Sequence, residues 1–515
     1  MDDATDHMAL IDRLRPGSGG RSSSAAPVPP SDARPDARPD PRPGPGEDGD
    51  RSPQGRSAAG RLFSPDWADR QFTVLFWARV AMSGARALAG VLVPVYLALQ
   101  GFTALTLGVL FFAVAIFAAL LSSGMGLLSD RVGRKKFLVA VPLLAAAAGA
   151  VFAVTTWAPA LFVMAVVGSF GRGAGAGAGA VGPYQPVESA MVVEVTPAVH
   201  RNDAFGRLAF GSSLGALVGS LAALLADGHH DPGAPALAAF RAGFLAAAVL
   251  AAVAGLVALA LHEPDPAGRY REAGAVGRPE APETAGVTAP AASGPAGDGG
   301  VRGPDRRVRF PHRSRWLLYR LWVTNGVNGL AIGMFGPFVT YWLFRRYGVG
   351  VGEIGILYAV INVATMPSTL SAAGLARRFG LVRTVTVVRF AQAVLIVPMV
   401  LAPTFALAGA IYLLRMVAQR IGLPLRQSYV LAMADPGERA SVAALSNLPS
   451  QAAMAASPVL SGYLFDSVSL ELPFEIAAVL QLVNTALFWG FFHRAAPEEE
   501  REGSQRGGAT SPTRS

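Results

Sequence analysis

The stretch of sequence that decides the fold is GLLSDRVGRKKFL, residues 126–138. It holds four basic residues and one aspartate, and it lies between two apolar runs near 105–128 and 137–157. A helix needs about 20 apolar residues to cross the hydrocarbon core of a bilayer. The stretch is therefore predicted to be a charged loop between two membrane-spanning helices.

Long apolar blocks separated by short polar loops continue on both sides of this stretch. Hydrophobic residues make up 52% of the 515-residue chain and charged residues only 15%, whereas a soluble domain carries about 25% charged residues. Two blocks, residues 159–194 and 404–433, are too long for one straight span, and their prolines predict kinks or extensions beyond the bilayer. The pattern predicts an all-α membrane protein with twelve transmembrane helices, near residues 73–98, 105–128, 137–157, 159–194, 204–226, 236–261, 317–344, 351–375, 384–402, 404–433, 439–465 and 472–493.

Polar segments divide these blocks into two groups of six. The segments at both ends and in the middle are rich in Pro, Gly, Arg and acidic residues. Such segments bury too little apolar surface to offset the chain entropy that folding removes. We expect a disordered cytosolic N-terminal tail (1–70), an N-terminal six-helix bundle (71–262), a cytosolic linker (263–315), a C-terminal six-helix bundle (316–494) and a disordered cytosolic tail (495–515).

The distribution of positive charge predicts the orientation. Basic residues concentrate in the central linker and in the loops that join spans 2 and 3 (loop 2–3), 4 and 5, and 8 and 9. The loops that join spans 1 and 2, 3 and 4, and 9 and 10 carry no charge. Excess Lys and Arg marks the cytoplasmic side of a membrane protein, although Arg345 and Arg346 depart from this pattern. Both termini are therefore expected in the cytosol. The abundance of Arg, Ala, Gly and Pro is typical of a GC-rich bacterial genome, which favours the bacterial inner (plasma) membrane.

Several function classes are excluded by what the sequence lacks. It has no cysteine, which excludes disulfides, thiol nucleophiles and cysteine metal sites. Its seven histidines fall in tails, loops or span ends, and no pair has a metal-ligand spacing on a helix. Neither a phosphate-binding loop nor a serine nucleophile motif is present. We expect no enzyme activity, metal or cofactor. Since the net charge of +9 comes mostly from tails and loops, we also expect no nucleic-acid partner.

The two halves carry a weak internal repeat. PVESAMVVEVTP, which begins at Pro186, matches PLRQSYVLAMADP, which begins at Pro424, with one insertion. Repeats joined by a central linker are typical of secondary transporters.

The loop at 126–138 resembles the loop 2–3 signature of the major facilitator superfamily, and the resemblance extends over about residues 70–496. It implies two pseudo-symmetric six-helix bundles, a central substrate cavity and alternating access. In this setting Gly126 allows two helices to approach closely, and Gly133 permits a tight turn. The residues that reproduce the signature in full are Gly126, Asp130, Arg131, Gly133, Arg134 and Lys135.

These residues predict a latch on the cytosolic side. Asp130 is an anion that can cap the N-terminus of span 11 near Ser441. Arg131 and Arg134 can bind a carboxylate at the end of span 4, for which Glu194 is the best candidate. The latch would break when the protein opens inward. Alternatively, the cations only set the topology.

Several arginines lie inside predicted spans, where inserting one costs about 2.5–3.5 kcal/mol. Arg79 and Arg86 of span 1 are seven residues apart, so they share a helix face. Arg172 of span 4 resembles the family's arginine in that helix, and Arg415 is its counterpart in span 10. If they face a cavity, they favour an anionic or zwitterionic substrate. Alternatively, Arg79 and Arg172 lie at a membrane interface.

Glu188 is the acidic residue that the sequence places well inside a span. An intramembrane carboxylate is by default a candidate proton relay or cation site. Arg426 occupies the equivalent position in the second half. We expect Glu188 to carry a coupling proton, with a fixed ion pair as the alternative.

Amide side chains complete the candidate site. The resemblance implies that spans 1, 4, 7 and 10 line the cavity. Asn325 and Asn328 of span 7 are three residues apart and can share a face, and Gln419 lies one turn beyond Arg415. They are predicted substrate contacts, with interhelical hydrogen bonds as the alternative.

Span 5 contains Gly211, Gly215 and Gly219 at four-residue spacing, which predicts a close-packing ridge. Drug/proton antiporters of the family have a Gly-Pro dipeptide in a similar pattern, and this chain lacks that proline. The resemblance to that subgroup is therefore partial.

We expect a secondary active transporter that moves a small organic solute by alternating access, with proton-coupled efflux as its mode. The alternatives are a proton-independent uniporter or anion exchanger, and a non-transporting membrane sensor or scaffold. The expected partners are a small-molecule substrate and the lipid bilayer. We expect a monomer that uses no cofactor and takes its energy from the proton gradient.

Overall fold

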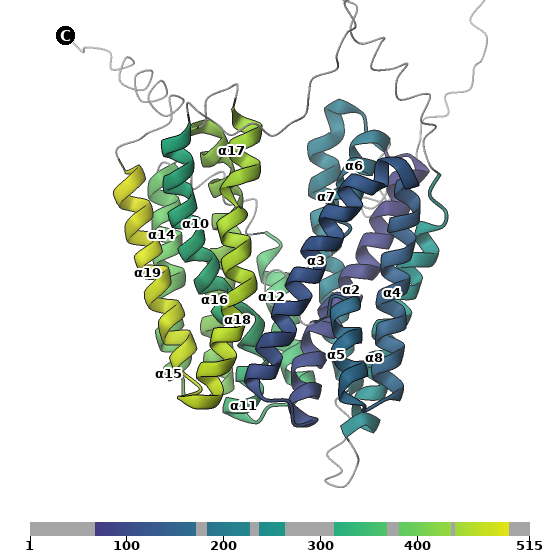
Figure 1. The fold of residues 1–515 in the computed structure, drawn as a ribbon, viewed down its shortest axis with the longest axis horizontal. Helices are drawn as coiled ribbons and strands as arrows, with labels where there is room; N and C mark the ends of the chain where they lie inside the picture. Colours follow the sequence, from purple (N-terminus) through teal and green to yellow (C-terminus); the bar gives the residue numbers. More distant parts are fainter. Residues whose placement is uncertain are drawn as a thin grey trace, which may run out of the picture. The chain divides into compact units, whose positions relative to one another are not determined.

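The computed structural model describes residues 67–170, 183–226, 236–262, 314–367, 378, 381–433 and 438–493. All regular elements in these residues are helices (Figure 1). The predicted tails, the linker and residues 171–182 of span 4 lie outside the described residues.

The N-terminal half forms one group of packed helices. Within it, α2 packs along α7 and α8, and α4 also packs along α8. The helices are α2 (Arg70–Leu99), α3 (Ala104–Val132), α4 (Arg134–Val154), α5 (Ala158–Val167), α6 (Gln185–Val195), α7 (Arg201–Ala222), the short η2 (Ala223–Ala226) and α8 (Ala236–Ala258).

The C-terminal half forms the second group. Within it, α10 packs along α18 and α19, and α14 packs along α16 and α19. The helices are α10 (Arg315–Phe335), η3 (Gly336–Phe338), α11 (Val339–Tyr347), α12 (Val351–Thr365), α14 (Leu381–Val394), α15 (Ile396–Leu401), α16 (Phe405–Met433), α17 (Arg439–Ser446), α18 (Leu448–Ser467) and α19 (Leu472–Phe492).

Nine helices among the described residues are long and apolar enough to cross a membrane. The other three predicted spans fall on α5 with α6, on α12, and on α17 with α18. These helices are shorter or less apolar, partly because breaks interrupt them. Span 4 leaves the helical conformation after α5, where Ser169 takes a positive φ of 54°. The all-α membrane fold predicted from the sequence is confirmed.

Two glycine turns mark the opposite ends of the helices. Gly101 has a φ of 85° and joins α2 to α3, and Gly133 has a φ of 103° between α3 and α4. A positive φ costs glycine little because it has no Cβ, so the predicted tight turn at Gly133 is confirmed. We call these the Gly101 end and the Gly133 end.

Small residues bring helix backbones into contact. A Cβ atom added at Gly215 or Gly219 of α7 would overlap the backbone of Val80 or Gly84 in α2. The glycine ridge predicted for span 5 is therefore a packing surface, as the spacing indicated.

The two groups of helices meet along α3 and α18 and along α7 and α12 (Figure 1). Described contacts between them gather at the Gly101 end. The ring of Phe111 in α3 packs edge-on against Phe338, with centroids 5.4 Å apart. Gly355 near the start of α12 lies against the carbonyl of Ser220 near the end of α7.

Candidate functional site

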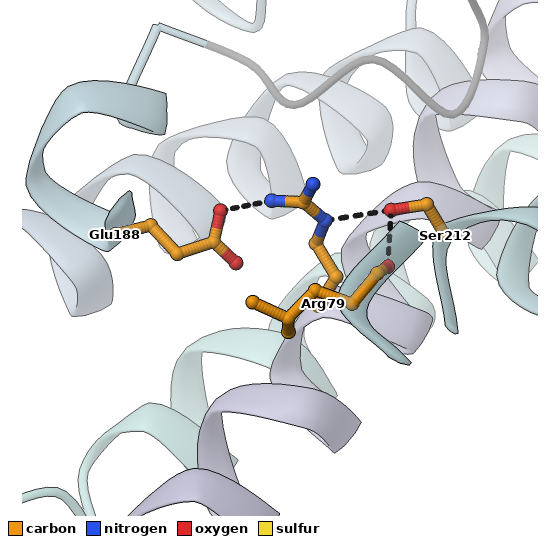
Figure 2. Close-up of polar contacts among 4 residues, drawn as sticks. Arg79, Glu188 and Ser212 are labelled. Carbon is orange, nitrogen blue, oxygen red and sulfur yellow. Dashed lines mark hydrogen bonds and ion pairs between the residues drawn. The ribbon is translucent and has the colours of Figure 1, made fainter. Parts of the chain in front are cut away.

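Glu188 forms an ion pair with Arg79 (Figure 2). The carboxylate comes from the first turn of α6. Pro186 is well placed in this turn, because the N–H group that proline lacks would have no acceptor within the helix there. The Arg79 guanidinium reaches it from α2, and Nη1 of Arg79 donates to Oε2 of Glu188. The pair thus joins two helices whose residues are 109 positions apart in the sequence.

A serine of a third helix completes this arrangement. Arg79 Nε donates to Oγ of Ser212 in α7 at 2.6 Å. The Ser212 hydroxyl in turn donates to the carbonyl of Leu208, one turn earlier, at 3.0 Å. Arg79 is therefore held from both sides, and α2, α6 and α7 meet at one guanidinium (Figure 2).

The ion pair lies inside the N-terminal group of helices. Glu188 is 2% exposed, and the Arg79 side chain is 13% exposed. Arg79 and Glu188 line a small pocket together with apolar residues of α4 and α8, including Leu138, Pro142 and Ala258. A charge in such surroundings is costly unless a partner of opposite charge neutralises it. The fixed ion pair that the sequence left as an alternative is the arrangement present.

Other arginines of the predicted site are only partly described. Arg86 is half-buried in α2, two turns beyond Arg79. Arg172 lies outside the described residues, and the same is true of the side chain of Arg426 in α16.

Part of the predicted latch is visible at the Gly133 end. Arg134 at the start of α4 forms an ion pair with Glu194 of α6, with 2.5 Å between Nη1 and Oε1. Lys135 is half-buried beside it. Asp130 and Arg131 lie in the last turn of α3, but their side chains are outside the described residues.

The described residues show no close helix approach at Gly126. Gly126 is exposed, and no described atom lies within 4 Å of a Cβ atom built on it. The described contacts between the two groups of helices gather instead at the Gly101 end, so the role expected of Gly126 stays a prediction.

Asn325 and Asn328 make hydrogen bonds between helices. Asn325 Nδ2 donates to the Ser446 carbonyl at 2.7 Å, and Trp322 Nε1 donates to the Leu445 carbonyl at 2.9 Å. These carbonyls lie at the break between α17 and α18. Asn328 Oδ1 accepts from Asn484 of α19 at 3.2 Å. Both residues thus form interhelical hydrogen bonds, which the sequence left open as the alternative to substrate contacts.

A buried arginine in α14 was missed from the sequence. Arg389 is 6% exposed, donates to Oδ1 of Asn484 at 3.2 Å, and lies 4.7 Å above the Phe488 ring. It extends the Asn328–Asn484 network to a third helix. A single arginine within the apolar block at 384–402 was the available signal.

Arg415 of α16 is a deeply buried cation. It is 4% exposed, and its guanidinium carbon lies 4.0 Å above the Phe335 ring of α10, a cation–π contact. Its Nε has no hydrogen-bond partner among the described residues. Gln419, one turn further along α16, is half-buried. The C-terminal half therefore contains a buried donor that could bind an anionic group.

Comparison with known proteins identifies the family. The family model described as Major Facilitator Superfamily matches residues 75–415 and 321–514. The chain belongs to the major facilitator superfamily. Its members are transporters, so this protein is a multi-pass membrane transporter and not an enzyme. None of the curated protein sequences compared with it matches.

Solved structures of major facilitator transporters share the fold. A peptide transporter crystallised with sulfate aligns with a TM-score of 0.59 at 15% identity, over 85% of this chain and 96% of its own. A bacterial homologue of the human lysosomal transporter Spinster, inward-facing and unoccupied, gives 0.57 at 15%, over 83% and 97%. The nucleoside transporter NupG gives 0.57 at 13%, over 82% and 98%.

Asp130→Asn should slow or abolish transport while leaving membrane insertion intact. The substitution removes the negative charge predicted to cap span 11. Flux in proteoliposomes measures the effect, and protein recovered from the membrane fraction measures insertion. Wild-type flux in this variant would show that the signature aspartate is no part of a latch.

Proposed function

We propose that this protein is a secondary active transporter that exports a small organic solute in exchange for protons. The observation that carries the proposal is the buried Glu188 carboxylate bound to Arg79, which Ser212 also holds. Protonation of Glu188 would remove the charge that holds Arg79. The contact joining α6 to α2 would then weaken, so a proton would change the packing of helices in the N-terminal half.

The loop charges support an orientation in a bacterial inner membrane. Lys and Arg concentrate in the loops at the Gly133 end, and such an excess marks the cytoplasmic side. In this orientation both termini and the linker are cytosolic, and the Gly101 end faces outward. We propose that the protein acts as a monomer, with the proton gradient as its energy source and without a cofactor.

Arg415 supports an anionic or zwitterionic substrate. A buried guanidinium with a donor that lacks an acceptor is unfavourable, and a carboxylate or phosphate on the substrate would supply one. The cation–π contact with the Phe335 ring, 4.0 Å from the guanidinium carbon, helps to hold the guanidinium in place. Such a site would bind an organic anion better than a cationic drug.

The same residue favours a second function, proton-independent uniport or anion exchange. A cationic site can carry one anion in and another out with no proton involved. A transporter fold used as a sensor or scaffold is a third candidate, and it would show no flux.

Flux in proteoliposomes separates these candidates. The panel contains organic anions and drug-like compounds, each measured with and without an imposed pH gradient. Gradient-driven flux is expected in the wild type and in Glu475→Gln, which makes the same chemical change at an exposed site of α19. Glu188→Gln should lose the gradient response but keep substrate exchange.

Three other results would count against proton-coupled export through Glu188. A gradient response that survives in Glu188→Gln would remove this residue from coupling. Wild-type flux that ignores the gradient would support the uniporter or exchanger, and absence of flux for every compound would support the sensor or scaffold.

A further inference from the structure

An aspartate of the C-terminal half caps a helix of the N-terminal half. Asp466 lies near the end of α18, and its two carboxylate oxygens accept from the backbone amides of Ala104 at 3.0 Å and Leu105 at 2.7 Å. These amides are the first two of α3. The first amides of a helix have no acceptor inside the helix, so Asp466 supplies what α3 itself cannot.

The remaining capping of α3 is local. Thr103 precedes the helix, and its hydroxyl accepts from the amide of Thr106 at 3.2 Å. Asp466 therefore adds to this cap without duplicating it. Its negative charge also lies at the positive end of the α3 dipole, which is a favourable position.

Close packing surrounds this contact. A Cβ atom added at Gly462, one turn before Asp466, would overlap the backbone of Ala104 and Leu105. A Cβ atom at Gly108 would overlap the carbonyl of Pro458. Because α3 and α18 touch backbone to backbone here, separating the two halves at the Gly101 end must break both hydrogen bonds to Asp466.

We propose that Asp466 is a gating residue that holds the Gly101 end closed and must release α3 before this end opens. The inference rests on the alternating-access cycle proposed above. Asp466 and Asp130 would play matching roles at the two ends of the same pair of spans. Asp130, at the end of α3, is expected to cap the start of α17. Asp466, near the end of α18, caps the start of α3. Each closed end would then have its own aspartate cap.

Distance measurements between spin labels test this gate. The chain has no cysteine, so labels go only where cysteines are introduced. One pair, at Leu99 and Leu401, reports the Gly101 end, and a second, at Val199 and Tyr319, reports the Gly133 end. All four side chains are exposed. The protein is measured in lipid nanodiscs, without substrate or gradient.

Asp466→Ala should shift the ratio of open to closed Gly101 ends by about 5- to 30-fold toward open, the effect expected for losing a helix cap. The distance should lengthen at the first pair and shorten at the second. Asp466→Asn should shift less, because its amide oxygen still accepts a hydrogen bond. Ser467→Ala is the matched control. Among the described residues, the Ser467 hydroxyl donates to the carbonyl of Tyr463 in its own helix and makes no hydrogen bond with α3, so this variant should behave as wild type.

Two results would overturn the gate. Exchange between two distances that is the same in Asp466→Ala and wild type would remove Asp466 from gating and leave alternating access intact. One fixed distance in every variant, including wild type, would overturn the gate and count against alternating access as well.

Discussion

Arg79→Ala should lower the free energy of unfolding by about 3–5 kcal/mol, the usual loss when one partner of a buried ion pair is removed. The substitution leaves the Glu188 carboxylate, which is 2% exposed, without its cation. Glu188→Ala should cost less. The Arg79 guanidinium would keep its hydrogen bond to Ser212, and at 13% exposure its side chain is closer to solvent. Unfolding of the purified protein in detergent measures both losses.

The double variant Arg79→Ala/Glu188→Ala should lose much less than the sum of the single losses, because no uncompensated charge remains. Arg346→Ala is the matched control. Arg346 pairs with Glu471 at 2.8 Å, but both side chains are partly exposed, at 39% and 29%. Its loss should stay within about 1 kcal/mol. A loss in Arg79→Ala no larger than in this control would show that the buried pair does not hold the helices together.

Gly219→Ala should destabilise the N-terminal half by about 1–3 kcal/mol, the usual cost of overpacking. The added methyl group would meet the carbonyl carbon and oxygen of Gly84 in α2, and both are backbone atoms. A flexible side chain could turn away, but a helix backbone must move as a unit. The expected result is a lower unfolding midpoint in detergent.

Gly206→Ala, in the same helix, is the control. A Cβ atom built at Gly206 meets no described atom within 4 Å. Alanine should therefore be neutral there or stabilise the helix by up to about 1 kcal/mol through its better helix propensity. Equal effects at both positions would mean that the α2–α7 contact is looser than its geometry indicates.

The outcome at the predicted site residues follows a physical rule. Where the partners are local or set by one motif, the sequence was informative. The turn at Gly133 follows from a glycine between two helices, and the contact of Arg134 with Glu194 follows from placing a cation and a carboxylate at neighbouring span ends. Asn325 and Asn328 show the limit. Their spacing predicted a shared face, but it could not say whether that face meets substrate or another helix.

The amino-acid sequence by itself determined the fold class, the family and the presence of ionisable groups within the spans. Apolar blocks must cross the bilayer as helices because only hydrogen-bonded backbone is tolerated there. Only the tertiary structure decided which groups meet. Arg79 finds Glu188 across 109 residues and Ser212 across 133, and Asp466 finds the start of α3 across 362. Helix packing selects such partners, because the sum of many close contacts sets the rotation and depth of each helix, and no short stretch of sequence contains that sum.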